Sequence, residues 1–190
     1  MRRRLWCSAK ENEICCSRHK KRSLTYYFSS KRENVLVYLS NAVEKCCREN
    51  GFPYEGPFYK WGPYGFDSDG VIRIEEYYPD ALLRTYKGVG GYIYSVKELP
   101  KGKPMEEIPN AFLSESPVPV EECEFVEDAY EEILKAEKAG LVRIVRYEQL
   151  SEKMKRWSER TILEEYEKAT DHPDYRFFLR ATFPEIIQGK

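Results

Sequence analysis

The sequence predicts an α+β fold in which a small sheet packs with three to four helices. Three observations predict it. Apolar residues recur at helical spacing in residues 31–50 and in two later segments, β-branched and aromatic residues cluster in VIRIEEYY (71–78) and GYIYSV (91–96), and the two kinds of segment do not alternate strictly.

The first predicted helix covers residues 31–50. Ser30 and Glu33 stand three residues apart, as in a capping box, and the apolar positions that follow lie on one helical face. Asn50 and Gly51 supply a C-terminal stop. On this helix Cys46 falls on the apolar face, which predicts that its side chain is buried.

Strands are expected at about residues 56–61, at 71–78 and at 91–96, with a short helix opened by Pro79 and Asp80 between the last two. Gly88, Gly90 and Gly91 end that helix, and their order in the chain does not match a phosphate-binding loop. Residues 97–119 contain five prolines and are predicted to form a long connection.

Further helices are predicted at about 120–139 and 148–169, separated by a strand, LVRIVRY, at 141–147. In the second of these helices Trp157 and Ile162 are expected to face inward. The last apolar segment is expected to dock as a short helix.

Length and composition favour one domain over residues 24–190, preceded by a basic, cysteine-containing arm at 1–23. No apolar run approaches the length that spans a bilayer, so we expect a cytoplasmic protein with no membrane partner. Glu and Lys are abundant, while Gln149 and Gln188 are the only glutamines, a composition that leans toward a thermophile.

Charge is distributed unevenly. Residues 1–32 carry ten Lys or Arg against Glu11 and Glu13, a net of +8, which leaves −9 for the rest of a chain whose net charge is −1. Such a basic segment is typical of contacts with DNA or RNA phosphates. Pairing of the arm with the protein's own acidic surface, or a start that is not native, explains the pattern equally well. The candidate nucleic-acid-binding residues are Arg2, Arg3, Arg4, Arg18, Lys20, Lys21, Arg22, Lys31 and Arg32.

The cysteines allow a structural zinc site in the arm, with Cys7, Cys15, Cys16 and His19 as ligands. Only Cys16 and His19 have a spacing that zinc sites commonly use, so free thiols are the simpler expectation. A disulfide from the arm to Cys46, Cys47 or Cys123 is a further alternative.

The segment GPFYKWGPYGFDSDG (56–70) partly matches a calcium-binding loop, with Asp67, Asp69, Gly70 and Glu76 at ligand or turn positions. The first ligand position, however, is Gly65. A tight turn at DSDG that leads into the next strand is therefore the preferred interpretation.

No catalytic motif is found, and no catalytic residue is assigned. Asp171, His172 and Asp174 could form an acid–base cluster, but a charged hinge around Pro173 explains them as well. Aromatic residues of the 56–70 segment suit a protein interface, and the candidate partner-binding residues are Tyr59, Trp61 and Tyr64.

FYKWGPYG (58–65) resembles the Y-x-Y-G-P-Y-S signature of the Panacea and YwgA-like proteins, with Gly62, Pro63 and Tyr64 at matching positions. VLVYLSNAV (35–43) is similar to the helix that precedes the signature in that family. YEEILKAEKAGLVRIV (130–145) looks like a winged-helix passage. The resemblance implies a winged-helix-like module with an antitoxin or regulatory role.

Three functions are therefore expected in order of preference. The first is a non-enzymatic regulatory or adaptor protein that binds nucleic acid through the arm and a protein through the aromatic segment. The second is an interaction module of antitoxin or inhibitor type without nucleic-acid binding. The third is an enzyme of unrecognised type with Asp171, His172, Tyr64 or Asp67 near a cleft.

Overall fold

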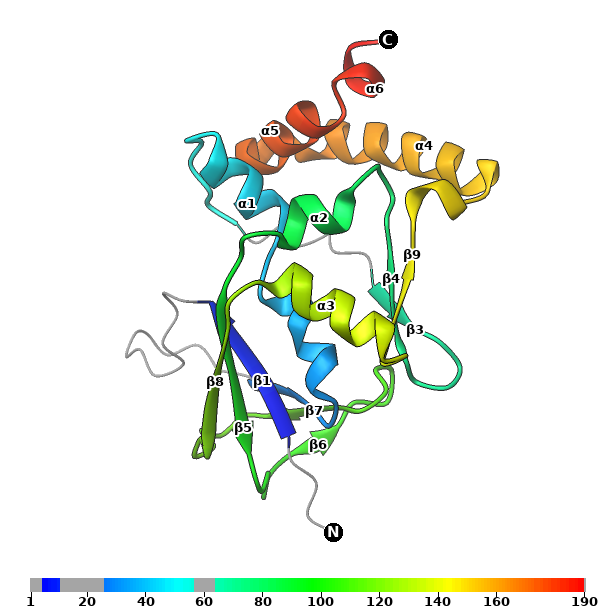
Figure 1. Ribbon diagram of the computed structural model, residues 1–190. Helices are drawn as coiled ribbons and strands as arrows, with labels where there is room; N and C mark the ends of the chain where they lie inside the picture. The colour runs from blue at the N-terminus through cyan, green and yellow to red at the C-terminus, as the bar shows by residue number, and fades with distance from the viewer. Residues whose placement is uncertain (1–4, 11–25, 57–63, 190) are drawn as a thin grey trace. The chain divides into compact units, whose positions relative to one another are not determined.

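The computed structural model describes residues 5–10, 26–56 and 64–189, and it confirms the α+β fold class (Figure 1). The chain divides into two compact units. Unit 1 comprises residues 1–40, 64–73 and 86–143, and unit 2 comprises residues 41–63, 74–85 and 144–190. The division falls within two strands, so the predicted domain boundaries stay a prediction.

Unit 1 is built on a six-stranded sheet with the strand order β6-β7-β2-β1-β5-β8. Its pairings are antiparallel, and Figure 1 shows β1, β5 and β8 side by side. The strands are β1 (Leu5–Lys10), β2 (Tyr26–Ser29), β5 (Gly91–Val96), β6 (Lys103–Pro104), β7 (Ala111–Ser114) and β8 (Glu122–Val126).

Strand β1 lies inside the segment 1–23, which shows no strand periodicity and which the sequence predicts to be an arm that is ordered only where something holds it. It pairs with β5 over its whole length, from Leu5 opposite Val96 to Lys10 opposite Gly91. Residues 5–10 are thus held by β5, because a strand can be fixed by its neighbours in a sheet even where its own sequence does not alternate. Likewise β6 and β7 occupy part of the predicted long connection.

The predicted helix at 31–50 is two helices. Residues 32–38 form a 3₁₀ helix, η1 (Arg32–Tyr38), and α1 (Ala42–Glu49) begins after Asn41. The Asn41 side chain accepts hydrogen bonds from the N–H groups of Val43 and Glu44, which starts a new helix there. No side-chain cap forms at the start of η1, so the predicted capping box is absent.

The break changes which cysteine is buried. Because α1 starts at its own cap, its phase is independent of the preceding apolar run. Cys47 is fully buried in α1, whereas Cys46 is only partly buried, so the prediction for Cys46 is corrected.

A three-stranded sheet has the order β3-β4-β9, with β3 (Tyr64–Phe66), β4 (Ile72–Glu75) and β9 (Val142–Val145). Between β3 and β4 the Gly70 N–H donates to the Asp67 carbonyl (2.8 Å), and the Asp67 N–H donates to the Val71 carbonyl (2.9 Å). Gly70 has φ of +73°, which glycine adopts without strain. The predicted tight turn at DSDG is confirmed.

The short helix α2 (Ala81–Tyr86) ends two residues before Gly88, which has φ of +71°. The predicted helix stop is confirmed. The helix predicted from about residue 120 starts later, as α3 (Ala129–Lys138), because the Asp128 carboxylate accepts hydrogen bonds from the N–H groups of Tyr130 and Glu131. Residues 122–126 are strand β8 instead.

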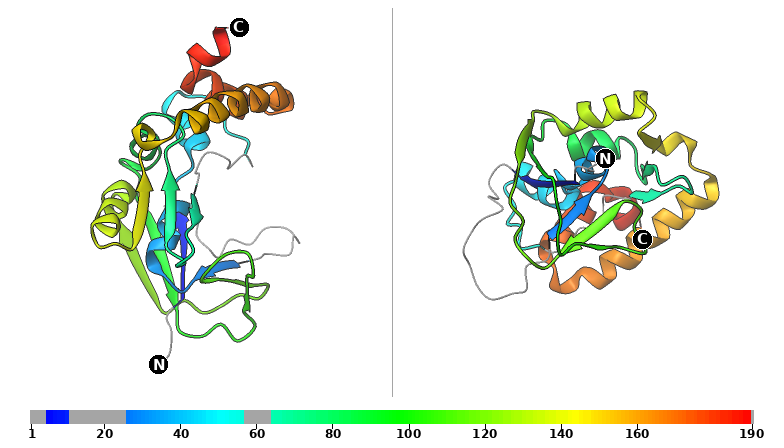
Figure 2. Two further views of the ribbon diagram at one scale, coloured as in Figure 1. Left: turned by 90° about the vertical axis from the view of Figure 1, so that its right-hand side faces the viewer. Right: turned by 90° about the horizontal axis from the view of Figure 1, so that it is seen from below.

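Unit 2 is mainly helical. After η2 (Tyr147–Gln149) come α4 (Glu152–Lys168), η3 (Ala169–Asp171), α5 (Pro173–Thr182) and α6 (Pro184–Gln188). Figure 2 shows the long α4 with α5 beside it. The core of unit 2 is formed by α1, α2 and these helices, with Ile162, Phe178 and Leu179 among its buried residues. Trp157, which was predicted to face inward, is 40% exposed and packs edge-on against Tyr77.

Candidate functional site: an aromatic cavity in unit 1

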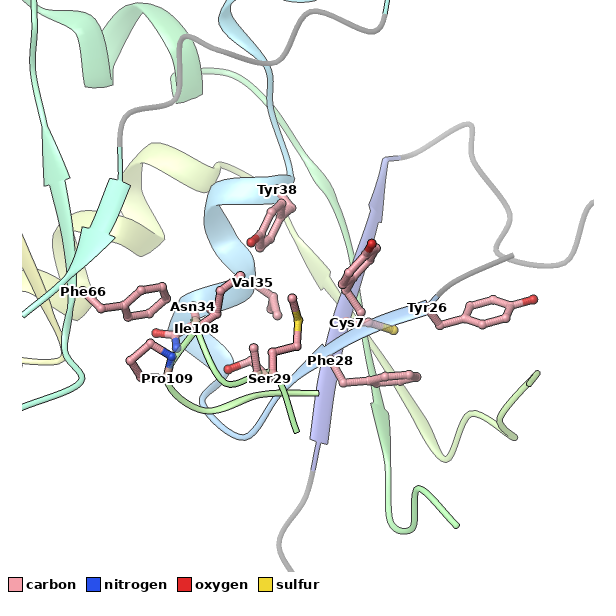
Figure 3. A pocket seen from close by; sticks show the side chains of 13 residues that line it. Cys7, Tyr26, Phe28, Ser29, Asn34, Val35, Tyr38, Phe66, Ile108 and Pro109 are labelled. Atoms are coloured by element: carbon pink, nitrogen blue, oxygen red, sulfur yellow. The ribbon is translucent and has the colours of Figure 1, made fainter. Parts of the chain in front are cut away.

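Unit 1 contains a cavity of about 450 Å³. Thirteen of the described residues line it, and none of these carries a formal charge (Figure 3). Aromatic and aliphatic side chains predominate, with three small polar groups among them. The lining residues are Cys7, Tyr26, Tyr27, Phe28, Ser29, Asn34, Val35, Tyr38, Phe66, Met105, Ile108, Pro109 and Ala111. Cavities of this size and composition are typical of sites for small molecules.

The cavity lies where two neighbouring strands separate. β1 and β2 pair at one position, Trp6 opposite Ser29, and then diverge (Figure 3). On its other edge β2 keeps its pairing with β7, from Tyr26 opposite Ser114 to Ser29 opposite Ala111. Cys7 of β1 and Phe28 of β2 both line the cavity, and Cys7 packs against the buried cluster of Phe28 and Val96.

The helix η1 forms one wall. It contacts β1, β2 and α3, and its residues 34–37 are buried. Arg32 secures it, because its guanidinium donates to Glu124 of β8 (2.9 Å for the Nε bond) and to Glu132 of α3 (3.1 Å). The hydrogen bonds to Glu124 are the largest influence raising the pKa of Arg32 above its usual value.

Two tyrosines stand together at this wall. The hydroxyl of Tyr64 in β3 donates to the hydroxyl of Tyr38 in η1 (2.7 Å), and the two rings meet edge to face with centroids 5.6 Å apart. Tyr38 lines the cavity and is 50% exposed. Partial burial, and then the hydrogen bond to Tyr38, raise the pKa of Tyr64 above its usual value.

Asn34 is the unusual polar residue of the lining. Its side chain is only 4% exposed, and neither its amide nitrogen nor its amide oxygen has a hydrogen-bond partner among the described residues. Figure 3 shows it on the side of the cavity where Phe66, Ile108 and Pro109 also lie. Sequence reasoning missed this residue, although one signal was present: Asn34 directly precedes the apolar run VLV.

The predicted calcium-like loop has a different role. Asp67 pairs with Arg73 (2.6 Å) and with Arg143 of β9, and Asp69 pairs with Arg143 (2.6 Å). Hydrogen bonds from Arg143 are the largest influence lowering the pKa of both carboxyls. The Glu76 carboxylate is buried and accepts from the N–H groups of Leu82 and Tyr147. Asp67 and Asp69 therefore pair with arginines, and Glu76 accepts hydrogen bonds from backbone amides, so all three carboxylates have a structural role.

Two of the nine candidate nucleic-acid-binding residues are described, and both make internal contacts. Lys31 donates to the Gly70 carbonyl (3.4 Å), and Arg32 makes the contacts given above. The other seven, Arg2, Arg3, Arg4, Arg18, Lys20, Lys21 and Arg22, lie outside the described residues. Their role stays a prediction.

Of the candidate zinc ligands, only Cys7 is described, while Cys15, Cys16 and His19 lie outside the described residues. Among the described residues no disulfide joins Cys46, Cys47 or Cys123 to another cysteine. The arm cysteines Cys15 and Cys16 lie outside the described residues, so the disulfide alternative stays a prediction. Within residues 5–10, 26–56 and 64–189, no group of three or more His, Cys, Asp or Glu side chains could hold a metal ion.

The candidate acid–base cluster is a structural connection in unit 2. Asp174 is 2% exposed, and its carboxylate accepts from the N–H groups of Glu55 (3.1 Å), Gly56 (2.9 Å) and Tyr175 (2.8 Å). It thereby holds residues 55–56 against the start of α5. Asp171, His172, Tyr64 and Asp67 are not among the residues that line the cavity.

The structure places one of the three candidate partner-binding residues. Tyr64 is hydrogen-bonded to Tyr38, which lines the cavity, whereas Tyr59 and Trp61 lie outside the described residues.

Among the described helices, none combines the length and the apolar character that crossing a bilayer requires. Comparisons with protein families, with curated proteins and with solved structures find no match for the chain.

Proposed function

We propose that this protein is a non-enzymatic regulatory or adaptor protein, and that the cavity of unit 1 binds a flat, uncharged ring compound. The observation that carries the proposal is the lining, in which aromatic rings and aliphatic side chains surround about 450 Å³ without a formal charge. A flat ring buries apolar area on both faces against such walls, which is the main source of affinity in small-molecule sites.

The chemistry of the lining favours binding over catalysis. No carboxylate, imidazole or ammonium group belongs to the thirteen lining residues, so Cys7 and the tyrosine hydroxyls are the only lining groups of a kind that serves as a general acid or base. Tyr27 and Tyr38 are 61% and 50% exposed, so their rings are accessible for stacking on a flat ligand.

The proposal can be tested by filling the cavity. Indole is a suitable probe because it is flat, uncharged and apolar. We expect isothermal titration calorimetry to detect indole binding to the natural chain, and Ala111→Trp to weaken it at least about tenfold, because the new ring would occupy the cavity. Val120→Trp adds the same ring at an exposed position of unit 1 and should leave binding unchanged. Equal indole binding in Ala111→Trp and the natural chain would rule out this cavity as the site.

Nucleic-acid binding through the basic N-terminal residues is a second candidate function. The observation that favours it is the net charge of +8 over residues 1–32 against −9 over the rest of the chain. Such a distribution supports salt-dependent attraction to phosphates. An antitoxin-like or inhibitor-like module that binds a protein through Tyr59, Trp61 and Tyr64 remains the alternative if nucleic acid is not bound.

A further inference from the structure

We propose that the unit 1 cavity binds a nucleobase, preferably adenine, and that the Asn34 side chain forms hydrogen bonds with the edge of this base. The inference rests on the proposed function, because it names the class of ring that the cavity takes. Two independent observations carry it: the uncharged aromatic cavity, and a buried carboxamide on its wall without a hydrogen-bond partner among the described residues.

The other described asparagines show how unusual Asn34 is. Asn41 caps α1, the Asn50 amide donates to the Cys46 carbonyl, and the Asn110 side chain accepts from the Ser30 hydroxyl. Each of these side chains gains a hydrogen bond within the chain. Asn34 gains none from the described residues, although it is the most deeply buried of the four.

A buried amide without partners destabilises the folded state, since its hydrogen bonds to water are lost and not replaced. The residues that follow Asn34 in η1 are Val35, Leu36 and Val37, and an apolar residue at position 34 would avoid the cost. A buried polar group without a partner requires an explanation, and a ligand that supplies the missing hydrogen bonds is one.

The geometry of a carboxamide limits what can complete it. It presents one acceptor oxygen and an NH₂ donor in a single plane, so its best partner has a donor and an acceptor side by side on a flat edge. Nucleobases carry such edges, and asparagine pairs with the N6 and N7 atoms of adenine through two hydrogen bonds. The aromatic walls suit the same ligand, because every base has a π face that stacks on aromatic side chains.

Adenine fits this lining better than guanine does. The cavity offers few polar side chains besides Asn34, namely Cys7, Ser29 and the tyrosine hydroxyls. Guanine adds a carbonyl oxygen and a second donor edge that would need further partners, and a buried polar group without a partner costs affinity. The uncharged lining also implies that the phosphate of a nucleotide, which is attached to its sugar, stays outside the cavity.

In this structure both polar atoms of Asn34 are closed to water. The carboxamide must therefore turn toward the cavity as the base binds. The adenine ring can belong to a free nucleoside or to an unstacked base of a single strand, and the chemistry at Asn34 is the same in both.

The test compares two ligands and two variants by isothermal titration calorimetry. Purine riboside lacks the 6-amino group of adenosine and so cannot make the paired contact. We expect the natural chain to bind adenosine about tenfold or more tightly than purine riboside, and Asn34→Leu to bind the two equally. Indole affinity should change less than about twofold in Asn34→Leu, since indole does not use the amide. Without ligand, the Asn34→Leu variant should melt at the same temperature as the natural chain or higher.

Ser95→Ala is the matched control. Ser95 lies in β5 of the same unit, is fully buried and has a hydroxyl without a hydrogen-bond partner among the described residues, but it does not line the cavity. Removing its hydroxyl should leave the binding of adenosine, purine riboside and indole unchanged. A change in adenosine affinity as large as that in Asn34→Leu would attribute the effect to core packing and overturn the role of Asn34.

The remaining outcomes separate the inference from the proposed function. If indole binds but the natural chain does not distinguish adenosine from purine riboside, the nucleobase inference is wrong and the ring-binding proposal stands. This comparison needs no variant, so it holds even if Asn34→Leu fails to fold. If no ring compound binds, both are wrong. For the source of the base, oligo(dA) that binds at least tenfold more tightly than both adenosine and oligo(dT) would indicate a strand, and adenosine that binds as tightly as oligo(dA) would indicate a free nucleoside.

Discussion

The hydroxyl of Tyr64 donates to the hydroxyl of Tyr38 at 2.7 Å, and so joins the predicted aromatic segment to the wall of the unit 1 cavity. The two residues are 26 positions apart in the chain and come from a strand and a 3₁₀ helix. This contact makes the ionisation of Tyr64 a reporter of the folded structure around the cavity.

The pH dependence of stability should reveal the partial burial of the Tyr64 hydroxyl together with its hydrogen bond to Tyr38. Because the pKa of Tyr64 is raised in the folded state, its stabilising effect is fully present below about pH 10, the unfolded value, and is lost as pH rises above it. The natural chain should therefore be more stable than Tyr64→Phe at pH 8, and this difference should shrink at pH 10.5. Denaturant unfolding at both pH values measures it.

Tyr27→Phe is the control for this experiment, since Tyr27 also lines the cavity but is 61% exposed. Measured at both pH values, this variant shows how the loss of an exposed tyrosine hydroxyl at the same cavity affects stability. A difference for Tyr64→Phe that does not depend on pH would contradict the assignment.

Asp174 should matter for the stability of unit 2. Its buried carboxylate accepts three backbone hydrogen bonds, two of them from residues 55 and 56. Replacement by alanine leaves those N–H groups without their acceptor, and we expect Asp174→Ala to lower the free energy of unfolding by about 2–4 kcal/mol. The nearby Asp171 is exposed, so Asp171→Ala should cost less than about 0.5 kcal/mol. Equal effects of the two variants in urea denaturation would refute this role for Asp174.

Arg32 and the N-terminal arginines should behave differently toward nucleic acid. Arg32 is occupied by Glu124 and Glu132, so Arg32→Gln should reduce stability by about 1–2 kcal/mol without changing the salt dependence of DNA or RNA binding. Replacing Arg2, Arg3 and Arg4 together by glutamine should reduce the slope of log K against log salt by about 1 for each phosphate that is no longer neutralised. Fluorescence anisotropy across a series of salt concentrations measures both. If the triple variant binds with an unchanged slope, the basic N-terminus does not contact phosphates.

The thiols should differ in reactivity. Burial raises the pKa of Cys47 to about 11, and its Sγ atom lies 3.6 Å from the Asp174 carbonyl, to which it donates. Since the thiolate is the reactive form, Cys47 should resist iodoacetamide at pH 8 in the folded chain. Cys123, which is exposed in β8, should be alkylated before Cys47. Peptide mass spectrometry after timed labelling measures this order, and early modification of Cys47 would show that α1 opens readily.

Several elements could be predicted from local sequence because local chemistry specifies them. The strand at residues 91–96 follows from the alternation of its side chains. The turn at DSDG and the helix stop at Gly88 each depend on a glycine with positive φ, which glycine adopts without strain. The break at Asn41 is also local, since its side chain caps the next helix, but the continuous apolar pattern around it concealed the signal.

The sequence by itself determined the α+β class and the type of most elements, because period and turn chemistry are properties of short segments. Only the tertiary structure decided that residues 5–10 form a strand, since their pairing with β5 joins segments about ninety residues apart. The cavity likewise depends on the separation of β1 from β2, and the unpaired state of Asn34 among the described residues depends on every group around it. Hydrogen-bond satisfaction is a property of three-dimensional neighbours, and for this reason no pattern in the chain could reveal it.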